Sequence, residues 1–128
     1  MNNSDDNILN LSKLPKTWIF DIDGTLVKHN GYLTDGYDSL LPGVKDFFSK
    51  IPDDDVVILL TSRKSENIES LKKFLESKNI KFNCIIPNLP YGERILVNDN
   101  KLSGLKCAYA INKTRDSELR INYRLTDE

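Results

Sequence analysis

Short apolar runs alternate with segments of helical spacing along the chain. A continuous β-branched and aromatic run predicts a strand buried on both faces, as in a parallel sheet. Runs of this kind cover residues 17–22 and 56–60, further strands are expected at residues 82–86 and 94–98, and residues 107–112 are compatible with a short edge strand. Strands separated by helices predict an α/β domain with a mainly parallel sheet and a three-layer, Rossmann-like arrangement.

Two segments between these runs have helical spacing. Val44, Phe47, Phe48 and Ile51 form one apolar stripe after Pro42-Gly43. A second helix is expected from an N-cap at Ser65 to a C-cap near Asn79. Its core stripe consists of Ile68, Leu71, Phe74 and Leu75.

The remaining segments predict loops. Residues 28–42 contain two glycines and the side chains of His29, Tyr32 and Tyr37, which predicts a flap or irregular hairpin. The acids of residues 53–55 are expected in a solvated turn. Residues 1–14 are polar and predict a flexible lead-in to a single domain spanning residues 1–128.

Composition narrows the class of protein. The net charge of −1 gives no electrostatic basis for binding nucleic acid or an anionic membrane. No apolar run is long enough to span a bilayer, and the acidic N-terminus does not have the pattern of a signal peptide. Cys84 and Cys107 are far apart and are expected to be small buried hydrophobes. A reducing cytoplasm is therefore the expected location.

Three of the apolar runs end in polar clusters. These are Asp21-Ile22-Asp23, Thr61-Ser62-Arg63 and Asn98-Asp99-Asn100-Lys101. Ligands of open parallel sheets bind outside the carboxyl ends of the strands, so all three clusters are expected at one edge of the sheet.

The chemistry of these clusters predicts a phosphoryl-transfer site. Three carboxylates in a small space would repel one another, and a divalent cation removes that repulsion. Because Asp21, Asp23 and Asp99 offer only oxygen ligands, the favoured cation is Mg²⁺. The hydroxyl groups, backbone N–H groups and positive charge that hold a phosphoryl oxygen would come from Thr61, Ser62, Arg63 and a lysine.

The order of the two aspartates suggests their roles. Asp21 at the strand end is placed to act as a nucleophile and to form an aspartyl-phosphate. Gly24 permits the turn that would bring Asp23 to the same side, where it can donate a proton to the leaving oxygen and later accept one from water.

The segments DIDGTLV, LLTSR and ILVNDNK resemble three motifs of the haloacid dehalogenase (HAD) phosphatase superfamily. The resemblance covers residues 18–110 and implies that Asp21 is the nucleophile and Asp23 the general acid/base. It also implies that Mg²⁺ is bound by Asp21, the backbone carbonyl of Asp23 and Asp99, and that Thr61 holds the transferring phosphoryl group.

The sequence departs from this family pattern at two points. The lysine or arginine that steadies the phosphate is not obvious, and Lys101 is favoured over Lys64 and Arg94 because it follows Asp99 at the expected sheet edge. The last motif has asparagines, Asn98 and Asn100, around a single aspartate.

The spacing of the motifs leaves no room for a separate cap domain. By the resemblance, capless members act on large, exposed phosphorylated substrates or close the site with a neighbouring subunit, so a homo-oligomer is one alternative. Residues 28–42 would contact the leaving group. Similarity to small HAD proteins of bacterial capsule and surface-polysaccharide gene clusters implies a phosphorylated sugar, polyol or amino-alcohol building block as the substrate.

Two alternatives to a phosphatase remain open. One is a non-catalytic phosphate-binding or regulatory module of the same fold, which the unclear cation and the sparse last motif favour. The other is a phosphotransferase that passes the phosphoryl group to an alcohol rather than to water.

Overall fold

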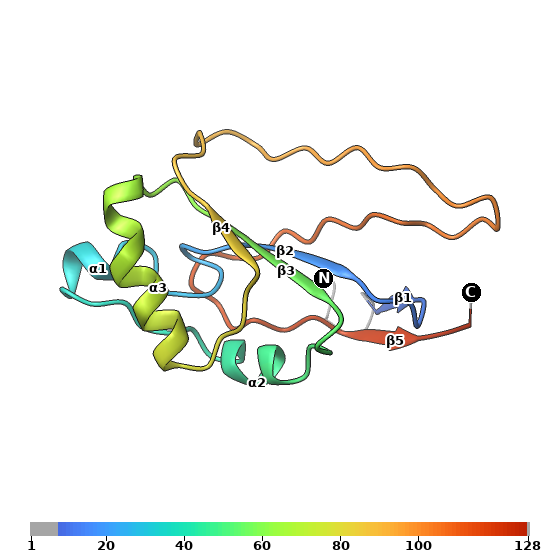
Figure 1. The fold of residues 1–128 in the computed structure, drawn as a ribbon, viewed down its shortest axis with the longest axis horizontal. Helices are drawn as coiled ribbons and strands as arrows, with labels where there is room; N and C mark the ends of the chain where they lie inside the picture. Colours follow the sequence, from blue (N-terminus) through green and yellow to red (C-terminus); the bar gives the residue numbers. More distant parts are fainter. Residues whose placement is uncertain (1–7, 128) are drawn as a thin grey trace. The chain divides into compact units, whose positions relative to one another are not determined.

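The structure, a computed structural model, describes residues 8–127 and has an α/β fold with small parallel sheets. Contacts between Cα atoms divide the chain into two compact units. The first, called the sheet unit here, comprises residues 15–91 and 113–120, and the second, called the strand-pair unit, comprises residues 8–14, 92–112 and 121–127. Figure 1 shows the elements of both units.

The sheet unit is built on three parallel strands in the order β2–β3–β4. Their bounds are Thr17–Asp21 for β2, Val56–Leu60 for β3 and Cys84–Ile86 for β4. Asp21 lies opposite Leu60, so β2 and β3 end at the same edge of the sheet. The predicted parallel pairing of these three runs is confirmed.

Aromatic packing covers one face of this sheet. Trp18 and Phe20 of β2 share that face with Val57 and Leu59 of β3, because these residues pair across the ladder. Phe47 of α2 (Val44–Ser49) contacts the Trp18 ring edge-on, with the two ring centroids 5.4 Å apart. Burial of these rings supplies much of the hydrophobic stabilisation of the unit.

The second predicted helix follows β3. A 3₁₀ turn, Ser65–Asn67, leads into α3, Ile68–Ser77, whose buried residues are Ile68, Leu71 and Leu75. Asn79 adopts a left-handed φ of 60° just after the helix, a conformation that asparagine tolerates and that ends the helix as predicted. Figure 1 shows α2 and α3 on the same side of the three strands.

The opposite face of the sheet is more open than the sequence predicted. Ile19 is 48% exposed and Ile86 is 43% exposed, and Cys84 is also exposed. The prediction that the strand at residues 17–22 is buried on both faces is therefore wrong at Ile19, and Cys84 is not a buried hydrophobe. Continuous apolar sequence indicates that a strand can be covered on both faces, but it does not supply the element that covers it.

The predicted flap contains a short helix, α1, which spans Gly31–Thr34. The two ends of the predicted flap come together, because the Lys28 amide donates to the Ser39 carbonyl at 3.0 Å and the Leu41 amide donates to the Leu26 carbonyl at 2.9 Å. An irregular hairpin was predicted here, and residues 28–40, called the flap below, have that form.

The strand-pair unit contains β1 (Leu9–Leu11) and β5 (Tyr123–Leu125), which pair in parallel with Leu9 opposite Tyr123. Residues 1–7 of the predicted lead-in lie outside the described residues. The remainder of that lead-in is not irregular throughout, because Leu9 and Leu11 flank the exposed Asn10 in the alternation typical of a strand.

Two predicted strands of the strand-pair unit do not form. Residues 94–98 and 107–112 have neither helical nor strand structure. Ile95 is 85% exposed and Val97 is 89% exposed, although both are β-branched. The prediction was wrong because strand propensity takes effect only where a neighbouring strand supplies hydrogen bonds and packing. Cys107 lies within the second of these segments and is only partly buried.

Asp55 corrects the prediction of a solvated acidic turn. Its side chain accepts hydrogen bonds from the Trp18 indole N–H at 2.9 Å and from the Lys16 amide at 3.0 Å. Asp55 is only 9% exposed, whereas Asp53 and Asp54 are exposed. Asp55 therefore anchors the start of β2 to the turn before β3.

Residues 113–120, called the strap here, were predicted only as polar sequence and pack against the sheet unit. Leu119 is 5% exposed, and its amide donates to the Pro42 carbonyl at 2.8 Å. Gly43 permits this approach, because a Cβ atom at that position would lie 2.4 Å from the Leu119 carbonyl oxygen. The strap thus completes the sheet unit from a segment distant in sequence.

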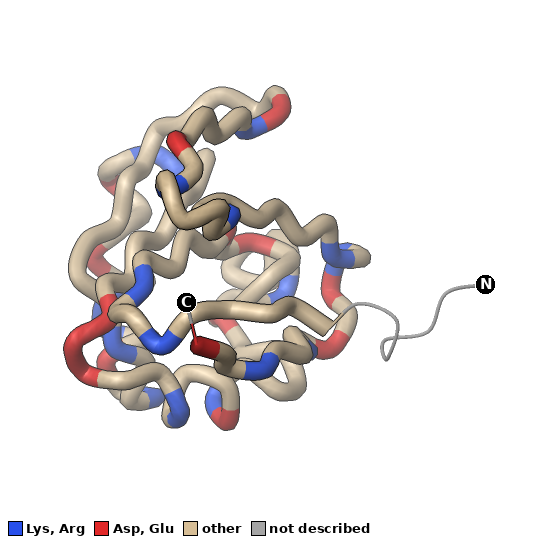
Figure 2. The backbone as a smooth tube through the Cα atoms, turned by 90° about the vertical axis from the view of Figure 1, so that its right-hand side faces the viewer, with Lys and Arg blue, Asp and Glu red and all other residues tan. Residues whose placement is uncertain are grey.

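Charged residues of both signs are interspersed along the backbone, as Figure 2 shows. None of the helices in the described part of the chain has the length and hydropathy needed to cross a bilayer.

The substitution Asp55→Ala should lower the free energy of unfolding by about 1–3 kcal/mol, because it leaves the Trp18 and Lys16 N–H groups without their acceptor. Urea unfolding followed by the fluorescence of Trp18, the single tryptophan, measures this change. Asp54→Ala, at the exposed neighbouring position, should change stability by less than about 0.5 kcal/mol. Equal effects of the two substitutions would contradict the anchoring role of Asp55.

A matched glycine pair tests the packing of the strap. Gly36 and Gly43 have nearly the same φ, 83° and 84°, but a Cβ on Gly36 would meet nothing within 4 Å. Both alanine variants carry the strain of a left-handed residue. Gly43→Ala should be the less stable by a further ~1–3 kcal/mol because it displaces Leu119. Equal melting temperatures for the two variants would show that the strap does not pack there.

Candidate functional site

The turn after β2 holds the first predicted cluster. The Ile22 amide donates to the Leu60 carbonyl at 3.0 Å and extends the β2–β3 ladder by one residue. The chain then curls back, and the Ile22 carbonyl accepts N–H bonds from Thr25, Leu26 and Val27. Gly24 is the residue that allows this turn, with a φ of 85°. Asp21 and Asp23 therefore lie on either side of the point where the backbone leaves the sheet.

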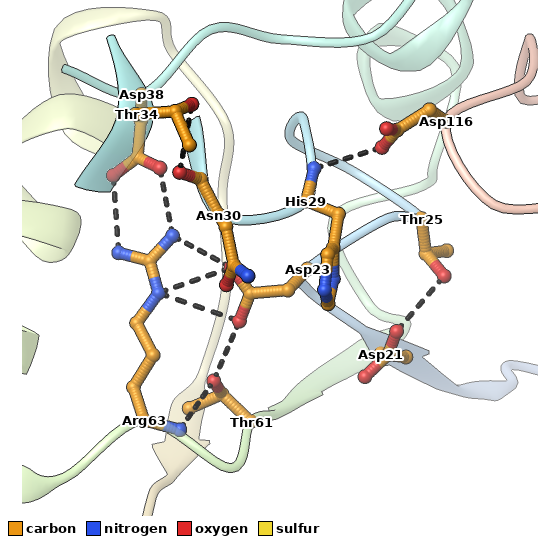
Figure 3. Close-up of polar contacts among 10 residues, drawn as sticks. All are labelled: Asp21, Asp23, Thr25, His29, Asn30, Thr34, Asp38, Thr61, Arg63 and Asp116. Carbon is orange, nitrogen blue, oxygen red and sulfur yellow. Dashed lines mark hydrogen bonds and ion pairs between the residues drawn. The ribbon is translucent and has the colours of Figure 1, made fainter. Parts of the chain in front are cut away.

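Thr25 fixes the predicted nucleophile. Its hydroxyl donates to Oδ2 of Asp21 at 3.0 Å, as Figure 3 shows. A carboxylate held by a hydroxyl from the same turn keeps one orientation, which a nucleophile requires. Thr25 was not identified as a site residue from the sequence, although it lies in the same DIDGT segment.

A hydrogen bond joins the first predicted cluster to the second. Thr61 is 1% exposed, and its hydroxyl donates to Oδ2 of Asp23 at 3.0 Å. The same hydroxyl oxygen accepts the Arg63 amide at 3.0 Å, which tightens the turn after β3. The expectation that the ends of β2 and β3 bring their polar residues together is confirmed for Asp23, Thr61 and Arg63.

Arg63 points into this cluster. Its Nη2 lies 2.7 Å from Oδ1 of Asp23 and 2.7 Å from Oδ1 of Asp38, and the side chain is 2% exposed (Figure 3). Burial alone would lower the pKa of Arg63, but the hydrogen bonds and negative charges of Asp38 and Asp23 raise it above its ordinary value. In the structure this guanidinium is occupied by two carboxylates, whereas the sequence had suggested it as a phosphate ligand.

Ser62 lies between Thr61 and Arg63 in the sequence, and its side chain faces the loop after β4. Its hydroxyl lies 3.4 Å from the Pro90 carbonyl, a long and exposed contact. The backbone of the same loop is held more firmly, because the Leu89 amide donates to the Thr61 carbonyl at 3.1 Å. The loop after β4 therefore supports the turn after β3.

The strap brings a lysine to the turn. Lys113 Nζ donates to the Gly24 carbonyl and to the Thr114 carbonyl, both at 3.1 Å. An ammonium group has three N–H donors, and the third makes no hydrogen bond with any residue that the structure describes. Burial lowers the pKa of Lys113, and the charges of Asp116 and Asp21 act in the opposite direction. Lys113 is thus a partly buried cation close enough to Asp21 to interact with it electrostatically.

Asp116 secures the strap on the same turn. Its amide donates to the Gly24 carbonyl at 2.8 Å, and its carboxylate accepts the His29 amide at 2.8 Å (Figure 3). The Nδ1 atom of His29 is buried and has no hydrogen-bond partner among the described residues. Asp116 of the strap is therefore hydrogen-bonded both to Gly24 and to His29, near the start of the flap.

The third predicted cluster lies in the other unit. Asn98, Asp99, Asn100 and Lys101 belong to the strand-pair unit and follow a segment that forms no strand. The argument that strand pairing carries this cluster to the sheet edge therefore does not hold in the structure. Among residues 8–127, no group of three or more His, Cys, Asp or Glu side chains could hold a metal ion. Of the other predicted cations, Lys64 is exposed, and Arg94 belongs to the strand-pair unit.

The sequence patterns did not identify the site residues whose contacts are distant in sequence. Lys113 contacts Gly24, which lies 89 positions earlier, and Asp38 contacts Arg63, which lies 25 positions later. Both lie in segments without helical or strand periodicity, so no pattern indicated what they face. The signal available for Asp38 was its place in the predicted flap.

Comparison of the chain with protein-family models, with curated proteins and with solved structures finds no match.

Proposed function

We propose that this protein is a Mg²⁺-dependent phosphatase that hydrolyses a phosphate monoester through an aspartyl-phosphate intermediate. The observation that carries the proposal is the convergence at one turn of Asp21, Asp23 and a partly buried lysine, Lys113. Nucleophile, acid/base and phosphate-binding cation are the groups that such a reaction requires.

In this proposal Asp21 attacks phosphorus and the alcohol leaves. Thr25 holds the attacking carboxylate in place. Asp23 gives a proton to the leaving oxygen and then takes one from the water that cleaves the acyl phosphate. Thr61 orients Asp23 through its hydroxyl, which donates to the Asp23 carboxylate.

Lys113 is proposed as the cation that steadies the phosphoryl group and Asp21. Two of its N–H groups are held by backbone carbonyls, and neither carbonyl neutralises its charge. The sequence favours Lys101 for this role, so Lys101 is the alternative that the experiment below separates from Lys113.

The proposed cation is Mg²⁺, because the ligands predicted from the sequence are of the type that suits a hard ion. Asp21, the backbone carbonyl of Asp23 and Asp99 offer oxygen only, which is the ligand type that Mg²⁺ prefers. When bound, the cation supplies positive charge that offsets the carboxylates and the phosphate. The role of Asp99 stays a prediction from the sequence.

The finer fold assignment also belongs to this proposal. We propose a Rossmann-like domain of the HAD type without a separate cap, located in the cytoplasm. The proposed substrate is a phosphorylated sugar, polyol or amino-alcohol building block of surface polysaccharide, with the flap facing its leaving group. The open edge that a capless site implies is compatible with a homo-oligomer.

The substitution Asp21→Asn should reduce phosphate release by at least about 1,000-fold, because the amide is not a nucleophile. A panel of phosphate esters assayed with Mg²⁺, and again with excess EDTA, measures this loss. EDTA should abolish turnover by the unaltered protein, and added Mg²⁺ should restore it.

Asp54→Asn, an exposed substitution of the same type, serves as the control and should retain full activity. Circular dichroism should show that both variants are folded. Turnover by Asp21→Asn at the unaltered rate would refute the covalent mechanism. Binding of phosphate and metal without turnover of any ester would instead favour a binding or regulatory module.

Lys113→Gln should lower kcat/KM by about 100-fold, the size of effect seen when one transition-state charge contact is removed. Lys101→Gln is the competing variant, and Lys45→Gln on α2 is an exposed control. Steady-state kinetics on the best ester of the panel distinguish them. A large loss in Lys101→Gln with none in Lys113→Gln would transfer the role to Lys101.

A further inference from the structure

The Arg63 side chain is shared between two carboxylates. Its Nε and Nη2 atoms donate to Asp23 at 3.1 and 2.7 Å, and its Nη1 and Nη2 atoms donate to Asp38 at 3.1 and 2.7 Å. Both pairs are two-point contacts, which fix the direction of a carboxylate as well as its distance.

Two other segments of the chain meet at this guanidinium. Asp23 comes from the turn after β2, and Asp38 comes from the flap. Tyr32, in α1 of the flap, stacks on the guanidinium, with the Cζ atom of Arg63 3.8 Å from the ring centroid. The flap is therefore attached to Arg63 at two points (Figure 3 shows the Asp38 contact).

The charged side chains of this cluster are buried, so water cannot easily take the place of any one of them. The side chains of Arg63, Asp38 and Asp23 are 2%, 6% and 17% exposed. By contrast, the side chains of the Lys50–Asp46 ion pair are 70% and 73% exposed, and such a pair contributes little to stability. Removing one member of the buried group leaves a charge without its partner, so the group acts as a unit.

We propose that Asp38 and Arg63 are positioning residues, which together form a latch between the flap and the proposed acid/base Asp23. Arg63 holds the Asp23 carboxylate in one orientation, and Asp38 fastens the flap to the same guanidinium. The catalytic consequence of the latch rests on the proposed phosphatase function, but the attachment itself does not.

The latch links contact with the leaving group to protonation of the leaving group. The flap exposes Leu33 and Tyr37, which are 67% and 65% exposed and are available to contact a leaving group. Because the flap and Asp23 share one anchor, a leaving group bound against the flap is held in register with the group that protonates it. Lysine cannot substitute for Arg63 here, because a single ammonium group lacks the planar fork that contacts both carboxylates.

Substitutions of Asp38 and of Arg63, the two residues of the latch, should affect different kinetic parameters. Asp38→Asn weakens one of the two attachments of the flap while Arg63 still holds Asp23, so KM should rise about tenfold with a smaller change in kcat. Arg63→Gln releases Asp23, so kcat should fall about 100-fold, and Arg63→Lys should not restore it. The double variant should be no worse than Arg63→Gln alone, because both substitutions break the same unit.

Hydrogen exchange tests the attachment without any assay of activity. The amides of Leu33, Thr34 and Asp35 bond to carbonyls within the flap, and they should exchange faster in Asp38→Asn and in Arg63→Gln. Asp46→Asn, which breaks an exposed ion pair on α2, is the matched control and should change neither exchange nor kinetics.

Each result supports or overturns the latch. It is overturned if flap exchange is unchanged in both variants, or if the double variant loses the product of the two single losses. A drop in melting temperature with unchanged kcat and KM would reduce the cluster to structural stabilisation. If the unaltered protein hydrolyses no ester, the proposed function fails, and hydrogen exchange still decides whether Arg63 fastens the flap.

Discussion

The parallel ladder between β2 and β3 is the constraint on which the site depends. Five residues pair in register from Thr17–Val56 to Asp21–Leu60, and this ladder makes the two strands end together. The side chains that follow them are therefore neighbours, and Thr61 reaches Asp23 across a gap of 38 residues in sequence. A shift of register would separate these two side chains, because every residue would then face a different partner.

The core supports this ladder from one side. Trp18 and Phe20 pack against Phe47 and Phe48 of α2, and Asp55 ties the start of β2 to the turn before β3. The other face is partly exposed at Ile19 and Ile86. The rigidity that a catalytic carboxylate needs therefore comes from aromatic packing beneath the strands and from polar contacts at their ends.

Local patterns in the sequence were enough to predict the three strands of the sheet unit, α3 and the meeting of Asp23 with Thr61. Each of these depends on periodicity or on the parallel geometry of adjacent runs. The run at residues 94–98 contains Ile95, Leu96 and Val97, the same apolar residue types as β3, yet it forms no strand, because residue type does not specify a pairing partner. Lys113 and Asp38 could not be predicted, since their roles depend on tertiary contacts between irregular segments.

The strap also affects the order in which the protein can fold. The Gly24 carbonyl receives two N–H groups from the strap, and the nearer of their residues lies 89 positions further along the chain. During translation, β2 and β3 can pair well before the strap leaves the ribosome. The surroundings of Asp21 are then completed late, by a contact of high sequence separation, and such contacts form slowly. A nascent chain would accordingly acquire its sheet before it acquires a finished turn.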